Sequence, residues 1–220
     1  MARTLGWKGR PDRLGADSRG VWQMEPVLQS RAVGSRFAWA VTHALSPAVL
    51  VSAYLLLLPL RAPEASWLQG LVAAVFTTGL PWLFLLWMKR AGQVTDLHVR
   101  ERAQRWPVFV CAAASLLIGC GAEVLLHAPA EVFRAMALIL AGLLVCALVN
   151  LWWKLSVHTA VAAFIGLSVC APFAWGSAAA LLLTMLVGWS RVEVRHHTPT
   201  QVLAGAVVGS ALFLGGLWWS

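Results

Sequence analysis

The chain has 220 residues, of which 60% are apolar and 12% are charged, and its formal net charge is +8. Ordinary soluble domains are roughly half apolar and about a quarter charged. The composition therefore excludes a disordered chain, a collagen-like chain and a disulfide-stapled secreted module, and it argues against a water-soluble globule. Because the basic residues lie between apolar runs, where they set topology and contact lipid headgroups, we expect membrane lipids as partners and no nucleic acid.

Residues 1–36 form a polar, basic segment with seven Lys or Arg and three Asp or Glu. The first 30 residues contain no apolar stretch of the kind found in signal peptides. We therefore expect a flexible or surface-lying tail over residues 1–36, followed by a membrane domain over residues 37–220.

Uncharged runs of about 20 residues, each long enough to cross a bilayer as a helix, recur after the tail. The runs are 37–60, 65–88, 106–122, 135–153, 155–190 and 198–220. The run 155–190 is too long for one span, and Pro172 and Gly176 predict a turn that divides it into two short helices. Pro47 is expected to kink the first run. The sequence thus predicts an all-α protein, a polytopic transmembrane helical bundle with about six to seven spans.

The basic residues are divided unequally between the two sets of loops. The loops on the side of the tail hold 15 of the 17 Lys and Arg, and the opposite loops hold only Arg61 and Arg134. Discounting four basic residues with a candidate chemical role still leaves 11 against 2. Because cytoplasmic loops are enriched in Lys and Arg, we expect the tail on the cytoplasmic face and the C-terminus on the opposite face.

Three polar clusters interrupt the apolar pattern, and all three fall on the basic side. They are TDLHVRERAQRWP at 95–107, KLSVH at 154–158 and SRVEVRHHTPTQVLAG at 190–205. Each cluster by itself has a structural explanation: arginine anchors at the membrane boundary, a helix cap beside an interfacial imidazole, and loop histidines. Together they are candidates for function, because ionisable groups at a membrane boundary cost free energy unless they are wet or paired.

The residue types in these clusters suit phosphoryl transfer. Guanidinium groups bind phosphate oxygens with two parallel hydrogen bonds, and serine hydroxyls and helix N-terminal amides add neutral donors. One histidine can attack phosphorus while another protonates the leaving oxygen. The clusters hold no carboxylate-rich or Cys/His ligand set, so we expect neither a metal ion nor a cofactor.

The third cluster resembles the signature SRxxxxxHxxxD of the type-2 phosphatidic acid phosphatase superfamily. Ser190, Arg191 and His197 match this signature, and Gln201 stands at the position of the aspartate. The second cluster resembles the PSGH motif of the superfamily, which Ser156 and His158 match. The first cluster resembles a bacterial variant, DxHxxxRxxR, through Asp96, His98, Arg102 and Arg105. The order and spacing of the three clusters also resemble those of the superfamily, so the resemblance covers about residues 37–219.

The resemblance implies a role for each matched residue. His197 would be the nucleophile that forms a phosphohistidine, and His158 would protonate the leaving group and then activate water. The phosphate-binding residues would be Arg102, Arg105, Ser156, Ser190 and Arg191. Lys154 lies two residues before Ser156 and can supply the charge of the lysine that the first cluster lacks. The alternative for Lys154 is a structural lysine that extends its ammonium group to the interface.

Gln201 has two competing interpretations. Thr198, Pro199 and Gln201 have the form of a capping box, in which the glutamine side chain reaches back to the N–H of Thr198. In the resemblance, Gln201 takes the place of the aspartate, and its oxygen accepts the ring N–H of His197. Because the two donors lie in different directions, we expect one amide to serve only one of them. We favour the histidine contact, because a nucleophilic imidazole needs its tautomer fixed.

These observations predict an integral-membrane, metal-independent phosphatase in a bacterial cytoplasmic membrane. Its substrate would be a lipid phosphomonoester or diphosphate, of polyprenyl or glycerophospholipid type, that is hydrolysed at the cytoplasmic face. The alternative is a catalytically weak or inactive member of the family that binds anionic lipids or serves as a structural subunit. The departures from the motifs favour this alternative, and the two histidines oppose it. In a transporter we would expect inverted repeats and broken helices at mid-membrane, whereas the polar groups here lie at one boundary.

Overall fold

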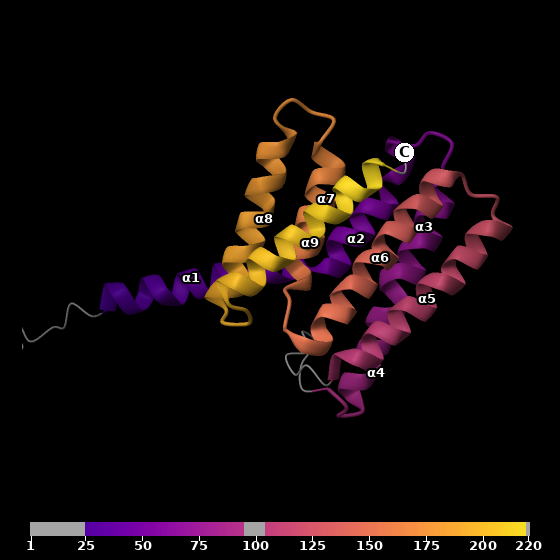
Figure 1. The fold of residues 1–220 in the computed structure, drawn as a ribbon. Coiled ribbons are helices and arrows are strands. Elements are labelled where there is room, and N and C mark those ends of the chain that lie inside the picture. The colour runs from indigo at the N-terminus through magenta and orange to yellow at the C-terminus, as the bar shows by residue number, and fades with distance from the viewer. Residues whose placement is uncertain (1–24, 95–103, 219–220) are drawn as a thin grey trace, which may run out of the picture.

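The computed structural model describes residues 25–94 and 104–218, with side chains from Ser35 onward except that of Arg105. Every regular element in these ranges is helical, which confirms the predicted all-α fold (Figure 1). The elements are α1 (Glu25–Ala44), α2 (Pro47–Leu56), η1 (Leu58–Leu60), α3 (Trp67–Ala74), η2 (Val75–Gly79), α4 (Leu80–Arg90), α5 (Arg105–Leu125), α6 (Ala130–Trp152), α7 (Val157–Cys170), α8 (Gly176–Glu193) and α9 (Pro199–Leu217). The π-helical turn η2 joins α3 and α4 into one continuous helix.

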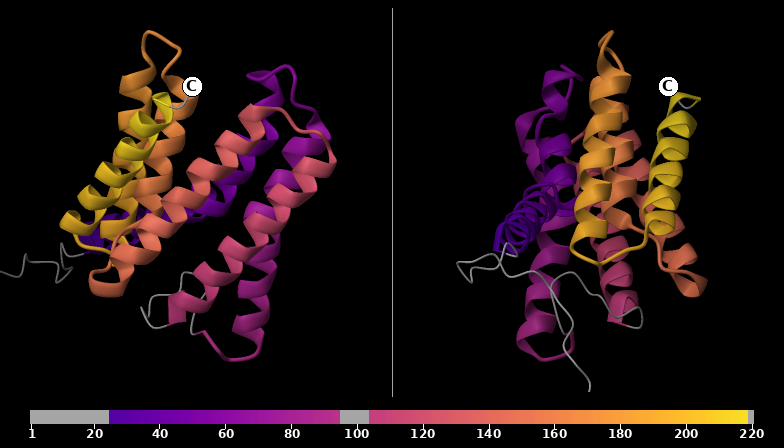
Figure 2. Two further views of the ribbon diagram at one scale, coloured as in Figure 1. Left: turned by 45° about the vertical axis from the view of Figure 1, so that its right-hand side comes forward. Right: turned by 90° about the vertical axis from the view of Figure 1, so that its left-hand side faces the viewer.

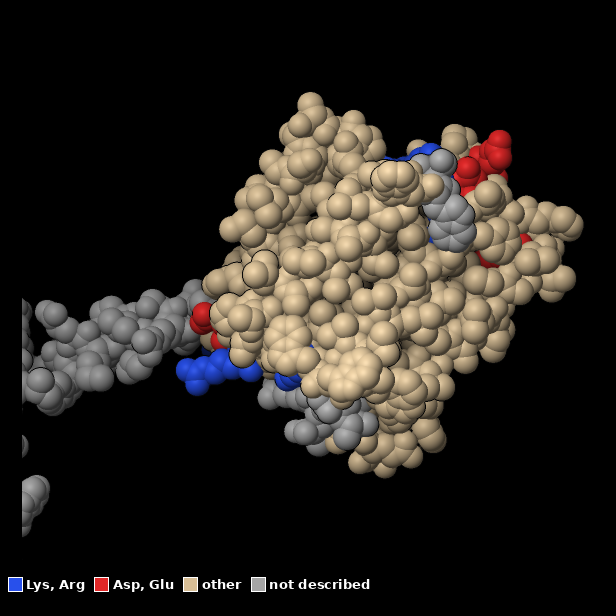
Figure 3. Space-filling model, viewed as in Figure 1, with Lys and Arg blue, Asp and Glu red and all other residues tan. Residues whose placement is uncertain are grey.

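Five helical segments are long and apolar enough to cross a bilayer, so the chain is an integral membrane protein. These segments are Ser35–Leu56, Trp67–Arg90, Trp106–Leu125, Ala130–Trp152 and Pro199–Leu217. The helix α7 is apolar but shorter, with 14 residues. Large apolar side chains such as Ile118, Leu182 and Leu203 are exposed along the bundle. On the face shown in Figure 3, charged residues lie at the two ends with an uncharged belt between them, which suits contact with lipid tails.

The first apolar run is broken where Pro47 predicts it. The helix α1 ends at Ala44, Ser46 caps the next helix by accepting the N–H of Val49, and α2 starts at Pro47. In Figure 1, α1 points away from the bundle at a wide angle to α2. The helix α1 begins at Glu25, so residues 25–36, which were expected to belong to a flexible or surface-lying tail, are helical. Residues 1–24 lie outside the described ranges.

The long run 155–190 folds as the predicted pair of short helices. The helix α7 ends at Cys170 and α8 begins at Gly176, so the turn lies where the sequence places it. The connections from α6 to α7 and from α8 to α9 both lie at the lower end of the bundle in Figure 1, and α9 ends at the upper end. The second and third polar clusters therefore share one end of the molecule.

Close packing of α7 against α9 brings these two clusters together, and Figure 2 shows α7, α8 and α9 side by side. Two glycines of α9 permit the approach. A Cβ at Gly205 would overlap the carbonyl oxygen of Ser156, and a Cβ at Gly209 would overlap that of Ala160. Small residues at such crossings let the backbones of membrane helices touch. The fold thus places the first turn of α9 directly on the first turn of α7.

Candidate active site

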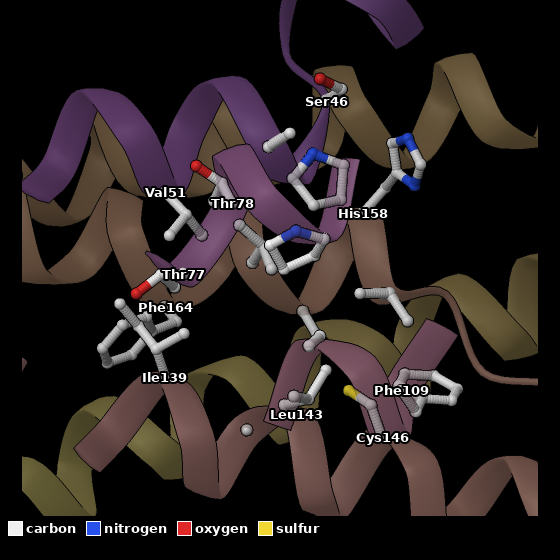
Figure 4. A pocket seen from close by; sticks show the side chains of 18 of the residues that line it. Ser46, Val51, Thr77, Thr78, Phe109, Ile139, Leu143, Cys146, His158 and Phe164 are labelled. Carbon is white, nitrogen blue, oxygen red and sulfur yellow. The ribbon is translucent and has the colours of Figure 1, made fainter. Parts of the chain in front are cut away.

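A cavity of about 400 Å³ lies among the helices and contains residues from both described clusters. His158, Arg191 and His197 are among its lining residues, together with His43 from α1. Most of the remaining wall is apolar, and Figure 4 shows Phe109, Leu143 and Cys146 on it. A mostly apolar cavity that also carries imidazole and guanidinium groups suits an amphiphilic anion.

The turn between α8 and α9 holds Arg191 and His197 beside each other. The carbonyl oxygen of Arg191 accepts both the N–H of His196 (3.1 Å) and the N–H of His197 (3.2 Å). Arg195, between them, has a left-handed backbone with φ of 55°. The side chains of Arg191 and His197 are only 2% and 9% exposed. Two cavity-lining groups of the third cluster are therefore fixed by the backbone of one tight turn.

Gln201 makes both of the contacts that the sequence presents as alternatives. Its Oε1 lies 3.1 Å from Nδ1 of His197 and also accepts the backbone N–H of Thr198 at 3.3 Å. In return, Thr198 Oγ1 accepts the N–H of Gln201, which completes the capping box. The expectation that one amide serves only one donor is therefore wrong. The first turn of α9 brings the N–H of Thr198 and the ring of His197 to the same oxygen.

This arrangement determines the tautomer of His197. The backbone N–H of Thr198 can only donate, so the atom that faces it must be the oxygen of the Gln201 amide. An amide oxygen can only accept, so Nδ1 of His197 carries the proton. The ring nitrogen that remains unprotonated is Nε2. A neutral imidazole in this tautomer presents Nε2 as its nucleophilic atom.

The first turn of α7 carries His158 and is tied to α9. The backbone N–H of Ser156 donates to the carbonyl oxygen of Gln201 (3.2 Å). The side chain of Ser156 caps α7 by accepting the N–H of Thr159. His158 follows within this capped turn and lines the cavity. The hydrogen bond between Ser156 and Gln201 therefore links the two segments that carry the two histidines.

The two serines that were predicted to bind phosphate lie in packing contacts instead. Ser156 is fully buried, and its hydroxyl contacts Thr159 Oγ1 at 2.8 Å. Ser190 is also fully buried; it donates to the carbonyl oxygen of Val187 (2.7 Å) and accepts from Thr42 (3.1 Å). Neither serine is on the cavity wall. The geometry gives both hydroxyls a structural role at helix ends.

The remaining predicted phosphate ligands are not on the described cavity wall. Lys154 is half-buried in the link between α6 and α7, outside the residues that line the cavity. Arg102 and the side chain of Arg105 lie outside the described part of the chain, as do Asp96 and His98. Of the predicted basic phosphate ligands, Arg191 is the one that the described structure places at the cavity.

The helix α1 contributes to the cavity, although none of the motifs in the sequence predicts this. His43 lines the cavity, and its ring stacks on Trp39 with centroids 5.5 Å apart. Trp39 also packs edge-on against His196, the neighbour of His197, at 5.3 Å. The only signal in the sequence is a polar imidazole within an apolar run. The cavity also contains Thr77 and Thr78, which the π-helical turn η2 carries.

Among the described residues, no group of three or more His, Cys, Asp or Glu is arranged to hold a metal ion. The four cysteines are free thiols. Cys146 lines the cavity, whereas Cys111, Cys120 and Cys170 are not among its lining residues.

Comparisons of the chain with protein-family models, with curated proteins and with solved structures found no match.

Proposed function

We propose that this protein is an integral-membrane phosphatase that hydrolyses a lipid phosphomonoester or diphosphate through a phosphohistidine. The observation that carries the proposal is that His158, Arg191 and His197 line the same cavity, with His197 held by Gln201. The resemblance of the motifs around these residues to the type-2 phosphatidic acid phosphatases supports the same chemistry. A buried, unusually placed set of titratable groups in a cavity is a typical mark of a functional site.

In the first step, Nε2 of His197 attacks phosphorus and forms a P–N bond while the bond from phosphorus to the lipid oxygen breaks. Arg191 donates hydrogen bonds from its guanidinium to the equatorial phosphoryl oxygens, where charge is concentrated in the transition state. His158 in its protonated form donates its proton to the leaving lipid oxygen. The positive charge that develops on the His197 ring is stabilised by the hydrogen bond from Nδ1 to Gln201.

In the second step, water restores the enzyme. His158, now neutral, removes a proton from a water molecule, and the oxygen of that water attacks phosphorus as the P–N bond breaks. Inorganic phosphate leaves, His158 is protonated again, and His197 regains its neutral tautomer. The apolar part of the cavity would hold the lipid portion next to the headgroup during both steps.

The position of the site in the membrane belongs to this proposal. Arg191 and Arg195 lie at the same end of the bundle as Lys89 and Arg90. Because the sequence assigns most of the basic residues to loops on the side of this end, the positive-inside rule supports a cytoplasmic site in a bacterial cytoplasmic membrane.

The second candidate is a protein that binds anionic lipid headgroups without turnover. The absence of an aspartate at position 201 favours it, because in a serine-protease triad an amide in place of the orienting aspartate costs about 10⁴ in rate. In that triad the loss comes from the wrong tautomer, whereas here the Gln201 oxygen selects the nucleophilic tautomer. The geometry therefore supports the enzyme better than the binding protein.

The test is phosphate release by the purified full-length protein in lipid nanodiscs. The panel contains a polyprenyl phosphate, a polyprenyl diphosphate and a glycerophospholipid phosphate, with EDTA present throughout. The wild type is expected to release phosphate from at least one of them, and His197→Ala to lower the rate by roughly 10³-fold or more. Headgroup binding by the wild type without phosphate release would establish the second candidate instead.

A further inference from the structure

The last turn of α1 forms part of the cavity that contains the candidate nucleophile, although no motif of the chain includes α1. His43 lies in this turn and lines the cavity together with His158, Arg191 and His197. Its imidazole is exposed rather than enclosed by other side chains. The position of His43 therefore brings a third histidine within the candidate site.

Two contacts of residues that precede His43 hold α1 in place. Thr42 donates a buried hydrogen bond to Ser190 (3.1 Å), the residue before Arg191. Phe37, one and a half turns earlier, packs against Trp189 at a centroid distance of 5.8 Å. Both contacts are to the end of α8 that carries Arg191. The register of α1 on α8 thus fixes His43 relative to Arg191.

Trp39 holds the ring of His43 and the turn with the nucleophile at the same time. One face of its ring stacks on His43, with the planes 21° apart. The same indole meets the His196 ring at 86°. His196 is 5% exposed and precedes His197. Aromatic pairs of both geometries are favourable, so a single tryptophan sets the orientation of His43 and braces the turn before His197.

The non-bridging oxygens of a phosphoryl group need more hydrogen-bond donors than Arg191 provides. A phosphoryl group under attack presents three non-bridging oxygens. In the proposed reaction His197 bonds phosphorus and His158 serves the leaving oxygen, so Arg191 is the guanidinium group that binds the non-bridging oxygens. Its fork matches two oxygens at once. Among the described residues that line the cavity, His43 is the remaining imidazole or guanidinium group.

We propose that His43 is a phosphate-binding residue of this site, and that Trp39 is the positioning residue that orients its ring. The N–H of His43 donates to a phosphoryl oxygen that Arg191 does not bind. The ligand is a phosphoryl group, whether on a lipid or as inorganic phosphate. The inference rests on the proposed function for its ligand, but it assigns a residue that none of the resembling motifs contains. It also replaces Lys154, which lies away from the cavity wall, as the additional donor.

Two variants of His43 separate hydrogen bonding from packing. His43→Phe keeps a ring that can stack on Trp39 but removes both ring nitrogens. His43→Gln keeps an N–H donor but loses the ring. Binding of inorganic phosphate and of orthovanadate to the purified full-length protein is measured by calorimetry, and phosphate release from lipid phosphate is measured on the same preparations. The matched control is His127→Asn, which changes an exposed histidine at the other end of the bundle.

We expect His43→Phe to weaken phosphate and vanadate binding roughly 10- to 100-fold, as the loss of a hydrogen bond to a charged group does. His43→Gln should retain most of the affinity, and His127→Asn all of it. The opposite order, with His43→Phe like the wild type and His43→Gln impaired, would show that the ring only packs, and it would overturn the inference. Equal affinity in all four proteins would overturn it as well.

The two measurements distinguish this inference from the proposed function. If phosphate binds and depends on the N–H of residue 43 but no lipid phosphate is hydrolysed, the inference stands and the phosphatase proposal fails. If lipid phosphate is hydrolysed but the affinity for phosphate and vanadate does not change when His43 is replaced, only the inference fails. A wild-type protein that binds neither phosphate nor vanadate contradicts both.

Discussion

Gln201 occupies the position at which the resembling motif has an aspartate, and its side-chain oxygen accepts hydrogen bonds from Thr198 and His197. An aspartate orients a nucleophilic histidine and also neutralises its positive charge. Gln201 retains the orienting function, because the amide is itself oriented by the backbone N–H of Thr198. It supplies no charge, so in the proposed phosphohistidine it would stabilise the imidazolium through its dipole.

Replacing Gln201 tests this division of roles. Gln201→Ala removes the acceptor for Nδ1 of His197, and we expect the rate of phosphate release to fall roughly 10²- to 10⁴-fold. The same change removes half of a capping box and should lower the free energy of unfolding by about 1 kcal/mol. Gln201→Glu keeps the length of the side chain and adds the charge, so its rate should equal or exceed that of the wild type. A Gln201→Ala protein with normal turnover and only a lower melting temperature would show that the oxygen serves the helix cap and not the histidine.

Arg191 is buried and lines the cavity, and its proposed function depends on the shape of the guanidinium group. Arg191→Lys keeps the charge but loses the fork that binds two phosphoryl oxygens. We expect kcat/KM for the lipid phosphate to fall roughly 10- to 100-fold. Arg195→Lys is the matched control, because Arg195 lies in the same turn with an exposed side chain. Equal losses in the two variants would mean that the loss does not come from the fork of Arg191 at the site.

The packing of α9 on α7 is the contact between elements on which the site depends. Gly209 lies where any Cβ would overlap the carbonyl oxygen of Ala160, whereas Gly215 has open space at that position. Gly209→Ala should force the helices apart, lower the free energy of unfolding by about 1–3 kcal/mol and reduce activity by separating His158 from His197. Gly215→Ala should change neither property. Thermal unfolding in detergent and phosphate release on the same samples measure both effects, and a fully active, stable Gly209→Ala protein would contradict the close approach.

The orientation of the whole bundle in the membrane follows from the unequal division of its basic residues. Arg195 lies at the end that carries the site, and Glu64 is exposed in the link between η1 and α3 at the opposite end. In a variant without the four native cysteines, Glu64→Cys should react with a membrane-impermeant maleimide in intact cells. Arg195→Cys should react only after permeabilisation. The reverse pattern would place the site outside the cytoplasm and contradict the positive-inside argument.

The membrane helices were predictable from the sequence because the thickness of the bilayer imposes their length and their apolar composition. The break at Pro47 and the turn before Gly176 were predictable as well, since each depends on backbone chemistry that is local in the chain. The start of α1 at Glu25 was not predicted. A basic, polar composition resembles a flexible tail even where it folds as a helix.

The parts of the site that could be predicted are those that one motif carries. Arg191, His197 and Gln201 lie within eleven residues of each other, and the geometry of one turn determines their relation. Ser156 and Ser190 were predicted to bind phosphate because they match the motifs. Their spacing in the sequence does not reveal that their hydroxyls form hydrogen bonds with Thr159 and Thr42. His43 was missed for the complementary reason: its contribution depends on how α1 docks on α8, which is a tertiary contact between residues far apart in the sequence.

Because α7 is short, we expect the turnover rate to depend on the thickness of the host bilayer. Fourteen residues give a helix about 21 Å long, and the hydrocarbon core measures about 30 Å. The exposed rings of Phe173 and Trp175, stacked 5.1 Å apart in the turn after α7, suit an interface. If these rings hold the C-terminal end of α7 at one interface, the first turn of α7 lies well short of the opposite interface. In the proposed reaction the phosphate group of the lipid must then move below the headgroup layer to reach His158. Short-chain host lipids reduce that descent, and long-chain lipids impose a larger mismatch. Turnover is therefore expected to fall as the acyl chains of the reconstituted bilayer lengthen.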